Sequence, residues 1–99
     1  MQILWTREAL KQLIGIENFI SKDSPERAVK FVDEIIEHAE VTLPDNPYIR
    51  RIVPEISNPA IRELIFKNYR IVYRINEKSI EILTIFEGHR LLRIDEIGI

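Results

Sequence analysis

The segment Pro44-Asp45-Asn46-Pro47 divides the chain into two parts with different patterning. Before it, apolar residues recur at intervals of three and four, which is typical of amphipathic helices. After it, short runs rich in Ile, Val, Tyr and Phe are separated by prolines and a polar turn, which is typical of strands. A chain of 99 residues has room for one such domain. The sequence therefore predicts a single α+β domain over residues 1–99.

Local signals predict where the elements begin and end. Residues 2–5 read as a short strand, and Thr6 is a suitable N-cap for a helix that runs to about residue 22. Ser24 followed by Pro25 starts a second helix, which ends near Thr42. The residues expected to face inward are Ala9, Leu10, Leu13, Ile16, Ile20, Ala28, Phe31, Val32, Ile35, Ala39 and Leu43.

The remaining elements are expected to form a three- to four-stranded antiparallel meander with both helices on one face. The expected strands cover residues 48–53, 61–66, 69–75 and 79–86. Alternation over 69–75 places Arg70 and Arg74 on one face and the aromatic and isoleucine side chains on the other. Because the helices cover only one face, we expect Arg70 and Arg74 to lie on a partly solvated face.

Composition excludes several classes of protein. The chain has no cysteine and only two distant histidines, so no metal site and no cofactor is expected. No segment approaches the length of about 18 apolar residues that a membrane helix needs, and the N-terminus has no leader pattern. A complete cytoplasmic protein is the expectation. The net charge of −2 disfavours a general nucleic-acid binder.

The charge is unevenly distributed along the chain. Residues 48–74 carry six basic residues, five of them arginine, against two acidic residues, whereas the segments on either side are acidic. Arginine suits the recognition of carboxylates and phosphates. From charge alone, a solvated strand face with ordinary surface ion pairs is the favoured interpretation. The candidate binding residues in and near this region are Arg51, Arg62, Arg70, Arg74 and Arg90.

A second hypothesis concerns catalysis. Cleavage of a phosphodiester without a metal needs groups that transfer protons and cations that stabilise the phosphorane. Glu55 or His89 could transfer protons, and Arg70 with Arg90 could stabilise charge. An exposed loop position is the alternative interpretation of His89.

The later part of the chain resembles the RelE/ParE superfamily of toxins from type II toxin–antitoxin systems, often described as plasmid stabilisation proteins. The segments that carry the resemblance are Arg51-Ile-Val-Pro-Glu55, Ile61-Arg-Glu-Leu64, Tyr69-Arg-Ile-Val-Tyr-Arg-Ile75, Ile80-Glu-Ile-Leu-Thr-Ile85 and Gly88-His-Arg90. Trp5, Ala9, Ser24-Pro25 and Ala28 also fit the family pattern. The resemblance implies a growth-inhibiting toxin that a cognate antitoxin neutralises, and no direct binding to DNA without that antitoxin.

The superfamily carries two activities on one fold. RelE-like members are metal-independent endoribonucleases that cleave mRNA on the ribosome, and on that reading Arg70, Arg90, His89 and Glu55 would be catalytic. ParE-like members inhibit DNA gyrase. This chain lacks the lysine cluster of the nucleases, and no tyrosine follows Tyr73. Those departures and the acidic balance favour a ParE-like toxin, and an inactive toxin fold that serves only as a binding protein is a further alternative.

Overall fold

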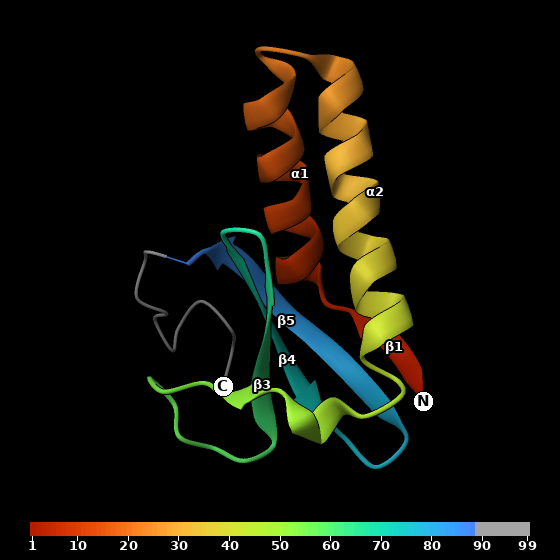
Figure 1. Cartoon of the computed structure of the whole chain (residues 1–99), viewed down its shortest axis with the longest axis vertical. Helices are drawn as coiled ribbons and strands as arrows, with labels where there is room; N and C mark the ends of the chain where they lie inside the picture. Colours follow the sequence, from red (N-terminus) through yellow and green to blue (C-terminus); the bar gives the residue numbers. More distant parts are fainter. Residues whose placement is uncertain (89–99) are drawn as a thin grey trace.

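The computed structural model describes residues 1–88 of the chain. The elements follow the order β1 (Gln2–Trp5), α1 (Arg7–Ser21), α2 (Pro25–Thr42), the 3-10 helix η1 (Pro47–Ile49), β2 (Arg51–Ile52), β3 (Ile61–Phe66), β4 (Tyr69–Ile75) and β5 (Ser79–Glu87). The predicted α+β class, and the order of one strand, two helices and then further strands, are confirmed (Figure 1).

Both helices begin at the side-chain caps that the sequence predicted. The Thr6 hydroxyl oxygen accepts a hydrogen bond of 3.2 Å from the amide of Ala9, and the Ser24 hydroxyl oxygen accepts one of 3.3 Å from the amide of Arg27. The Thr6 hydroxyl also donates to the carbonyl of Ile82 at 2.7 Å. Thr6 therefore starts α1 and also ties that start to β5.

The sheet has five strands in the order β1-β5-β4-β3-β2. Strands β2 to β5 form the predicted antiparallel meander. β1 adds to the other side of β5 in the parallel direction, a pairing that the sequence did not predict. Parallel neighbours need a long connection, and the helices and the meander between β1 and β5 provide it.

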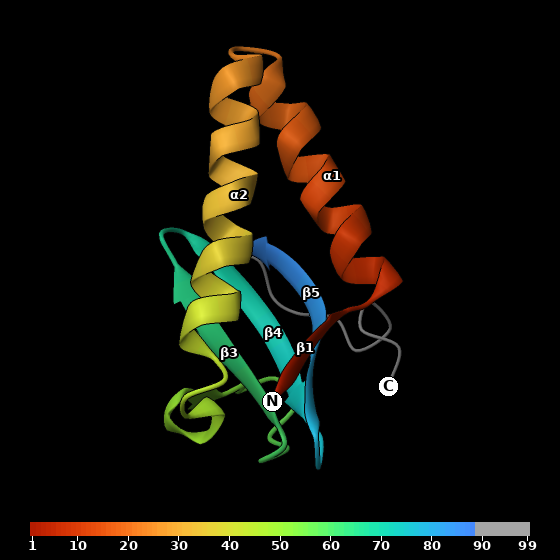
Figure 2. The ribbon, with the colours of Figure 1, turned by 90° about the vertical axis from the view of Figure 1, so that its right-hand side faces the viewer.

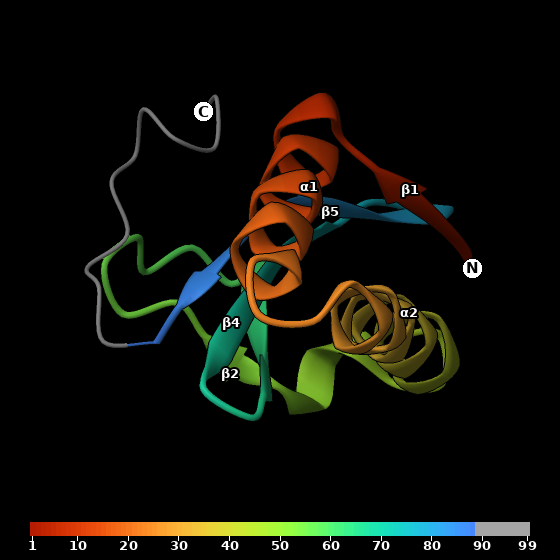
Figure 3. The same cartoon turned by 90° about the horizontal axis from the view of Figure 1, so that it is seen from above.

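The two helices pack on the same face of the sheet. α1 lies against β5 and α2 lies beside β3. The far ends of both helices extend beyond the sheet (Figure 2), and from above α1 is seen over β5 with α2 next to it (Figure 3). The main core lies between these layers. Its buried residues are Ala9, Leu13, Ile16, Val32, Ile35, Ala39, Leu43, Leu64, Ile71, Tyr73, Ile75, Ile80, Ile82 and Ile85.

The opposite face of the sheet is covered by the segment that joins β2 to β3. A second cluster of buried residues lies there, made of Val53, Ile61, Val72, Leu83 and Phe86, with Ile56 packed against it. This corrects the expectation of a solvated Arg70, because the segment covers that part of the face and only 6% of Arg70 is exposed. Arg74 remains half-buried on the same face.

Two other expectations are wrong. Leu10 is 47% exposed, because the face of α1 that meets the core is limited to the line of Ala9, Leu13 and Ile16. The predicted strand over residues 48–53 is reduced to the two residues of β2. Before β2 the chain forms η1, which does not pair with a strand of the sheet. A side chain binds its backbone there, because the Tyr73 hydroxyl donates to the carbonyl of Pro47 at 2.6 Å.

A register shift interrupts the pairing of β4 with β5. Val72 pairs with Thr84 and Tyr73 pairs with Ile82, so that Leu83 is an extra residue on β5. Beyond the shift, the alternation of β5 is reversed, and Ile85 faces the helices while Phe86 joins the opposite cluster. The bulge therefore places an aromatic ring on the same face as Arg70.

Candidate functional site

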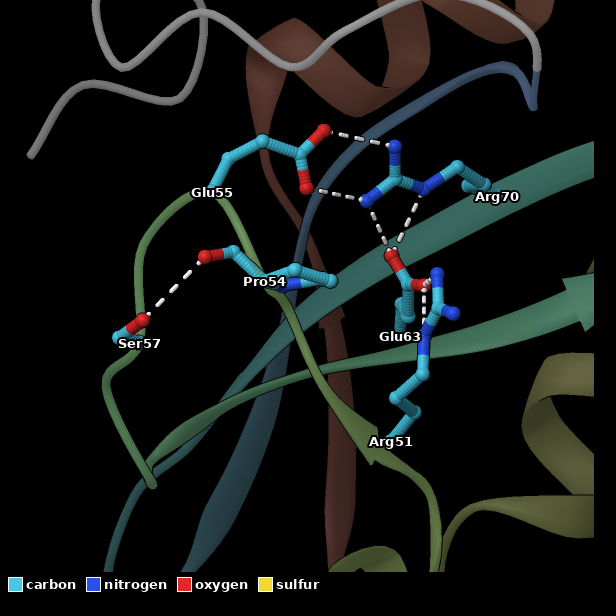
Figure 4. Close-up of polar contacts among 6 residues, drawn as sticks. All are labelled: Arg51, Pro54, Glu55, Ser57, Glu63 and Arg70. Carbon is cyan, nitrogen blue, oxygen red and sulfur yellow. Dashed lines mark hydrogen bonds and ion pairs between the residues drawn. The ribbon is translucent and has the colours of Figure 1, made fainter.

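The side chain of Arg70 lies at the centre of a buried ion-pair network on the face of the sheet opposite the helices. Its Nε donates to Oε1 of Glu63 at 2.7 Å. Its Nη1 and Nη2 donate to the two carboxylate oxygens of Glu55, at 2.8 Å each (Figure 4). This paired arrangement is the geometry in which a guanidinium binds a carboxylate most strongly.

Glu63 connects Arg70 to a second arginine. Its other carboxylate oxygen, Oε2, accepts a hydrogen bond of 2.7 Å from Nε of Arg51 and a further bond from Nη2 of Arg51. The side chain of Glu63 is fully buried, whereas 62% of the Arg51 side chain is exposed. We call these four residues, Arg51, Glu63, Arg70 and Glu55, the Arg70 cluster. Its charges alternate and sum to zero, and Arg51 is its solvent-facing end.

The pairing of the strands explains why these side chains meet. Arg51 lies opposite Glu63 across β2 and β3, so both side chains project from the same face. Arg70 lies opposite Ile65, two residues beyond Glu63 along β3, which makes Arg70 and Glu63 diagonal neighbours. The cluster therefore follows from the register of the β3–β4 hairpin.

Glu55 reaches the cluster from a turn and not from a strand. The amide of Ser57 donates to the carbonyl of Val53 at 2.9 Å, and the Ser57 hydroxyl donates to the carbonyl of Pro54 at 3.2 Å. Ser57 has a φ of 57°, an uncommon backbone conformation for a residue other than glycine. The turn directs the Glu55 carboxylate toward the guanidinium of Arg70 (Figure 4).

The groups around Arg70 stabilise its positively charged form. The hydrogen bonds that Arg70 donates to Glu55 are the main cause that raises the pKa of Arg70; burial lowers it, and the contacts with Glu63 raise it. The ring of Phe86 lies 4.8 Å from the guanidinium carbon. Arg70 is therefore a charged side chain whose neighbours already supply two carboxylates and an aromatic face.

The structure separates the other predicted site residues from this cluster. Arg62 lies opposite Tyr73, on the helix-facing side, and donates to the carbonyls of Pro59, Tyr48 and Arg50 at 2.8 to 3.0 Å. Arg74 forms an ion pair of 3.7 Å with Glu81. His89 and Arg90 lie outside the described residues. Of the predicted set, the structure brings together Arg51, Glu55 and Arg70.

Two members of the site were not among the sequence candidates. Glu63 shares a strand face with Ile61 and Ile65, and the short turn after β3 brings that face beside Arg70, so the pattern of the sequence contains a signal for it. Phe86 could not be found in this way, because its face depends on the bulge at Leu83. Within residues 1–88, no group of histidine, aspartate and glutamate side chains is arranged to hold a metal ion.

Comparison with known proteins agrees with this fold. The sequence profile of the family described as "ParE toxin of type II toxin-antitoxin system, parDE" matches residues 3–92. One similar solved structure is described as "Chromosomal ParDE TA system from P. aeruginosa". It is 28% identical with a TM-score of 0.73, over 88% of this chain and 95% of that one.

No curated protein matches this chain. None of the helices in the described part of the chain is sufficiently long and apolar to span a membrane. The family match covers nearly the whole sequence, and the similar structure shares the arrangement of two helices on a sheet. The chain belongs to the ParE toxin family of type II toxin–antitoxin systems.

Proposed function

We propose that this chain is a growth-inhibiting toxin that acts in the cytoplasm on a protein target, DNA gyrase, and that a cognate antitoxin neutralises it. The choice of gyrase over RNA as the target rests on the pairing of Arg70 with Glu55. These two residues are among the four candidates for charge stabilisation and proton transfer in an RNA-cleaving site, with His89 and Arg90 outside the described residues. Each binds the other through two hydrogen bonds of 2.8 Å.

That pairing is unfavourable for phosphodiester chemistry. A cation that stabilises a phosphorane must present its donors to the developing charge. The Arg70 guanidinium directs its Nε, Nη1 and Nη2 to carboxylates of its own chain. Glu55 and Glu63 also neutralise the positive charge of Arg70, so that its guanidinium attracts a phosphate less than an unpaired arginine would. The geometry thus supports a structural role for the cluster and a target other than RNA.

The antitoxin is expected to use the apolar surface that the helices present. A groove of about 700 Å³ lies between α1 and the adjoining ends of β4 and β5. Its apolar lining includes Ile16, Phe19, Tyr69 and Ile85, and Phe19 is 69% exposed. An amphipathic helix of a partner protein fits such a groove by its apolar face. The neighbour's description as a ParDE system supports a partner of this kind.

Induced expression in a bacterial host tests the proposal. We expect growth arrest, relief by co-expression of the protein encoded beside this gene, and loss of negative supercoils from a reporter plasmid recovered from arrested cells. Arrest with normal plasmid supercoiling and with mRNA cut at ribosomes would assign the RNA-cleaving activity instead. Unaffected growth at high expression would leave an inactive toxin fold that only binds a partner.

A further inference from the structure

Two arginines near the start of the meander carry positive charge that no carboxylate within residues 1–88 neutralises. Arg50 and Arg62 form no ion pair there, whereas the four other basic residues between positions 48 and 74 each bind an acidic side chain. Both are half-buried, and Nε of Arg50 is buried with no hydrogen-bond partner in this part of the chain. A buried donor without an acceptor is unfavourable, so the two arginines are suited to an anion from another molecule.

Hydrogen bonds of Arg62 hold the two arginines together. Its Nη1 donates to the carbonyl of Arg50 at 3.0 Å and to that of Tyr48 at 2.9 Å, and its Nε donates to the carbonyl of Pro59 at 2.8 Å. Burial raises the pKa of Tyr73, and the charges of Arg50 and Arg62 lower it. Both guanidinium groups therefore lie near the Tyr73 hydroxyl, and they form one positively charged site at the end of η1 and the start of β3.

Exposed apolar side chains adjoin the two arginines. Tyr48 is 55% exposed and Ile49 is 64% exposed, and the guanidinium carbon of Arg62 lies 5.4 Å from the centre of the Tyr48 ring. Tyrosine and arginine are the residue types that contribute most to the affinity of protein interfaces. We call Tyr48, Ile49, Arg50 and Arg62 the η1 patch. Its exposed apolar area and its positive charge fit a protein surface that presents a carboxylate.

The η1 patch is separate from the groove along α1. That groove is bordered by Asn68, in the turn between β3 and β4, and by Glu87 at the end of β5. The backbone of η1 instead contacts Arg62 and Tyr73, which lie toward the other end of β3 and β4. Figure 1 shows η1 at one end of the sheet and the turn between β3 and β4 at the other. The toxin therefore has room for two different partners.

A nucleic acid fits the η1 patch poorly. Glu37 and Glu40 are exposed on α2, the helix that leads toward η1, and the exposed Asp45 comes just before it. A nucleic acid carries a row of phosphates and needs an extended basic surface, which these acidic side chains interrupt. A single carboxylate of a protein needs only the paired donors of a guanidinium. The charges around the patch thus favour a protein partner.

We propose that this toxin binds DNA gyrase through the η1 patch, and that an acidic side chain of gyrase binds the guanidinium groups of Arg50 and Arg62. Tyr48 and Ile49 pack against apolar groups beside that carboxylate. Hydrogen bonds between charged groups are stronger than those between neutral ones, and the half-buried position of both arginines limits screening by solvent. The inference rests on the proposed function, because it assigns the partner as gyrase.

Inhibition of supercoiling by purified gyrase tests the inference. We expect Arg50→Gln to raise the concentration for half-inhibition at least about tenfold, because it removes the charge that binds the carboxylate. Arg27→Gln is the matched control, since it removes an exposed charge near the start of α2, and we expect a change of less than about twofold. Equal potency of Arg50→Gln and the natural chain would overturn the inference and leave the proposed function standing. No inhibition by the natural chain would contradict both.

Two further measurements distinguish a binding role of Arg50 from a structural one. Because no carboxylate within residues 1–88 pairs with Arg50, we expect Arg50→Gln to unfold at the same urea concentration as the natural chain, or at a higher one. We also expect it to bind the antitoxin as tightly as the natural chain does. A fall in the urea midpoint that accounts for the lost potency would contradict the inference. Equal losses of affinity for gyrase and antitoxin in a folded variant would assign the patch to the antitoxin and overturn it.

Ile49→Ser provides a second variant. The side chain of Ile49 is largely exposed, so its replacement should leave the fold intact even if Arg50→Gln does not fold. We expect the concentration for half-inhibition to rise at least about threefold, because an apolar contact with gyrase is lost. Val29→Ser, which changes an exposed apolar residue of α2, is the matched control with unchanged potency. Equal potency of the two serine variants would contradict the assignment of the patch.

Discussion

Arg70 and Glu55 are joined by two parallel hydrogen bonds of 2.8 Å, from Nη1 to Oε2 and from Nη2 to Oε1. Sequence reasoning placed both in an RNA-cleaving site with separate roles. In the structure, the pair holds the segment between β2 and β3 against the sheet, over the second apolar cluster. The same two residues thus stabilise the fold, and we expect their substitution to lower the free energy of unfolding.

We expect Arg70→Ala to lower the free energy of unfolding by about 3–5 kcal/mol, because it removes the buried cation that Glu63 and Glu55 share and both hydrogen bonds that Arg70 donates to Glu55. Urea denaturation followed by circular dichroism measures this. Arg74→Ala on the same strand is the matched control, with a loss below about 1 kcal/mol, since its ion pair is partly exposed. Equal small losses for both variants would show that the cluster contributes little.

Removal of the Glu63 side chain should destabilise the protein more than removal of the Arg51 side chain that binds it. Glu63→Ala is expected to destabilise the protein by about 3–5 kcal/mol, since it leaves Arg70 buried with one carboxylate partner fewer. Arg51→Ala is expected to cost less than about 1 kcal/mol, because most of the Arg51 side chain is exposed to solvent. The midpoints of thermal unfolding measure both. A larger loss for Arg51→Ala than for Glu63→Ala would contradict this order.

Arg62 is expected to stabilise the fold by joining the segment before β2 to the segment before β3. It donates to three backbone carbonyls, and its guanidinium lies 5.4 Å from the ring of Tyr48. Arg62→Lys keeps the charge but cannot reproduce three directed bonds, so we expect a loss of about 1–3 kcal/mol. Arg74→Lys is the control, because it makes the same arginine-to-lysine substitution at another position of the sheet. The prediction fails if the two lysine variants unfold at the same urea concentration.

Tyr73 should make the stability of the fold depend on alkaline pH. Burial raises its pKa from 10.0 to about 12, against a smaller opposing effect of the nearby Arg50 and Arg62. Because the folded pKa is above the unfolded one, this contribution is fully present below pH 10 and is lost as the pH rises toward 12. Urea unfolding between pH 9 and pH 12 measures it. Tyr73→Phe should remove this part of the decline, and an unchanged decline in that variant would contradict the assignment.

Much of the fold could be predicted from the sequence, because its signals are local. Thr6 and Ser24 cap the helices where they were expected to, and the strands over residues 61–66 and 69–75 are confirmed. The parallel pairing of β1 with β5 joins the two ends of the described chain, and no short-range pattern encodes it. The short β2 was also missed, since side chains from distant strands bind the backbone before it.

The candidate site was predictable only in part. The uneven charge distribution predicted that arginines would be part of the site, and strand alternation predicted that Arg70 and Arg74 share one face. Alternation does not show what lies above that face, so the cover that Glu55 and its turn provide was not foreseen. The burial of Arg70 depends on a loop whose position is set by tertiary contacts of Val53 and Ile56.

A supercoiling assay with purified gyrase and relaxed plasmid tests whether this ParE-family chain acts on gyrase and not on RNA. We expect the purified toxin to inhibit supercoiling, and a stoichiometric amount of its antitoxin to restore it. Glu63→Ala should lose potency only in proportion to its unfolded fraction. Full supercoiling at a large molar excess of folded toxin, together with cleavage of mRNA by the same preparation in a translation extract, would contradict the claim.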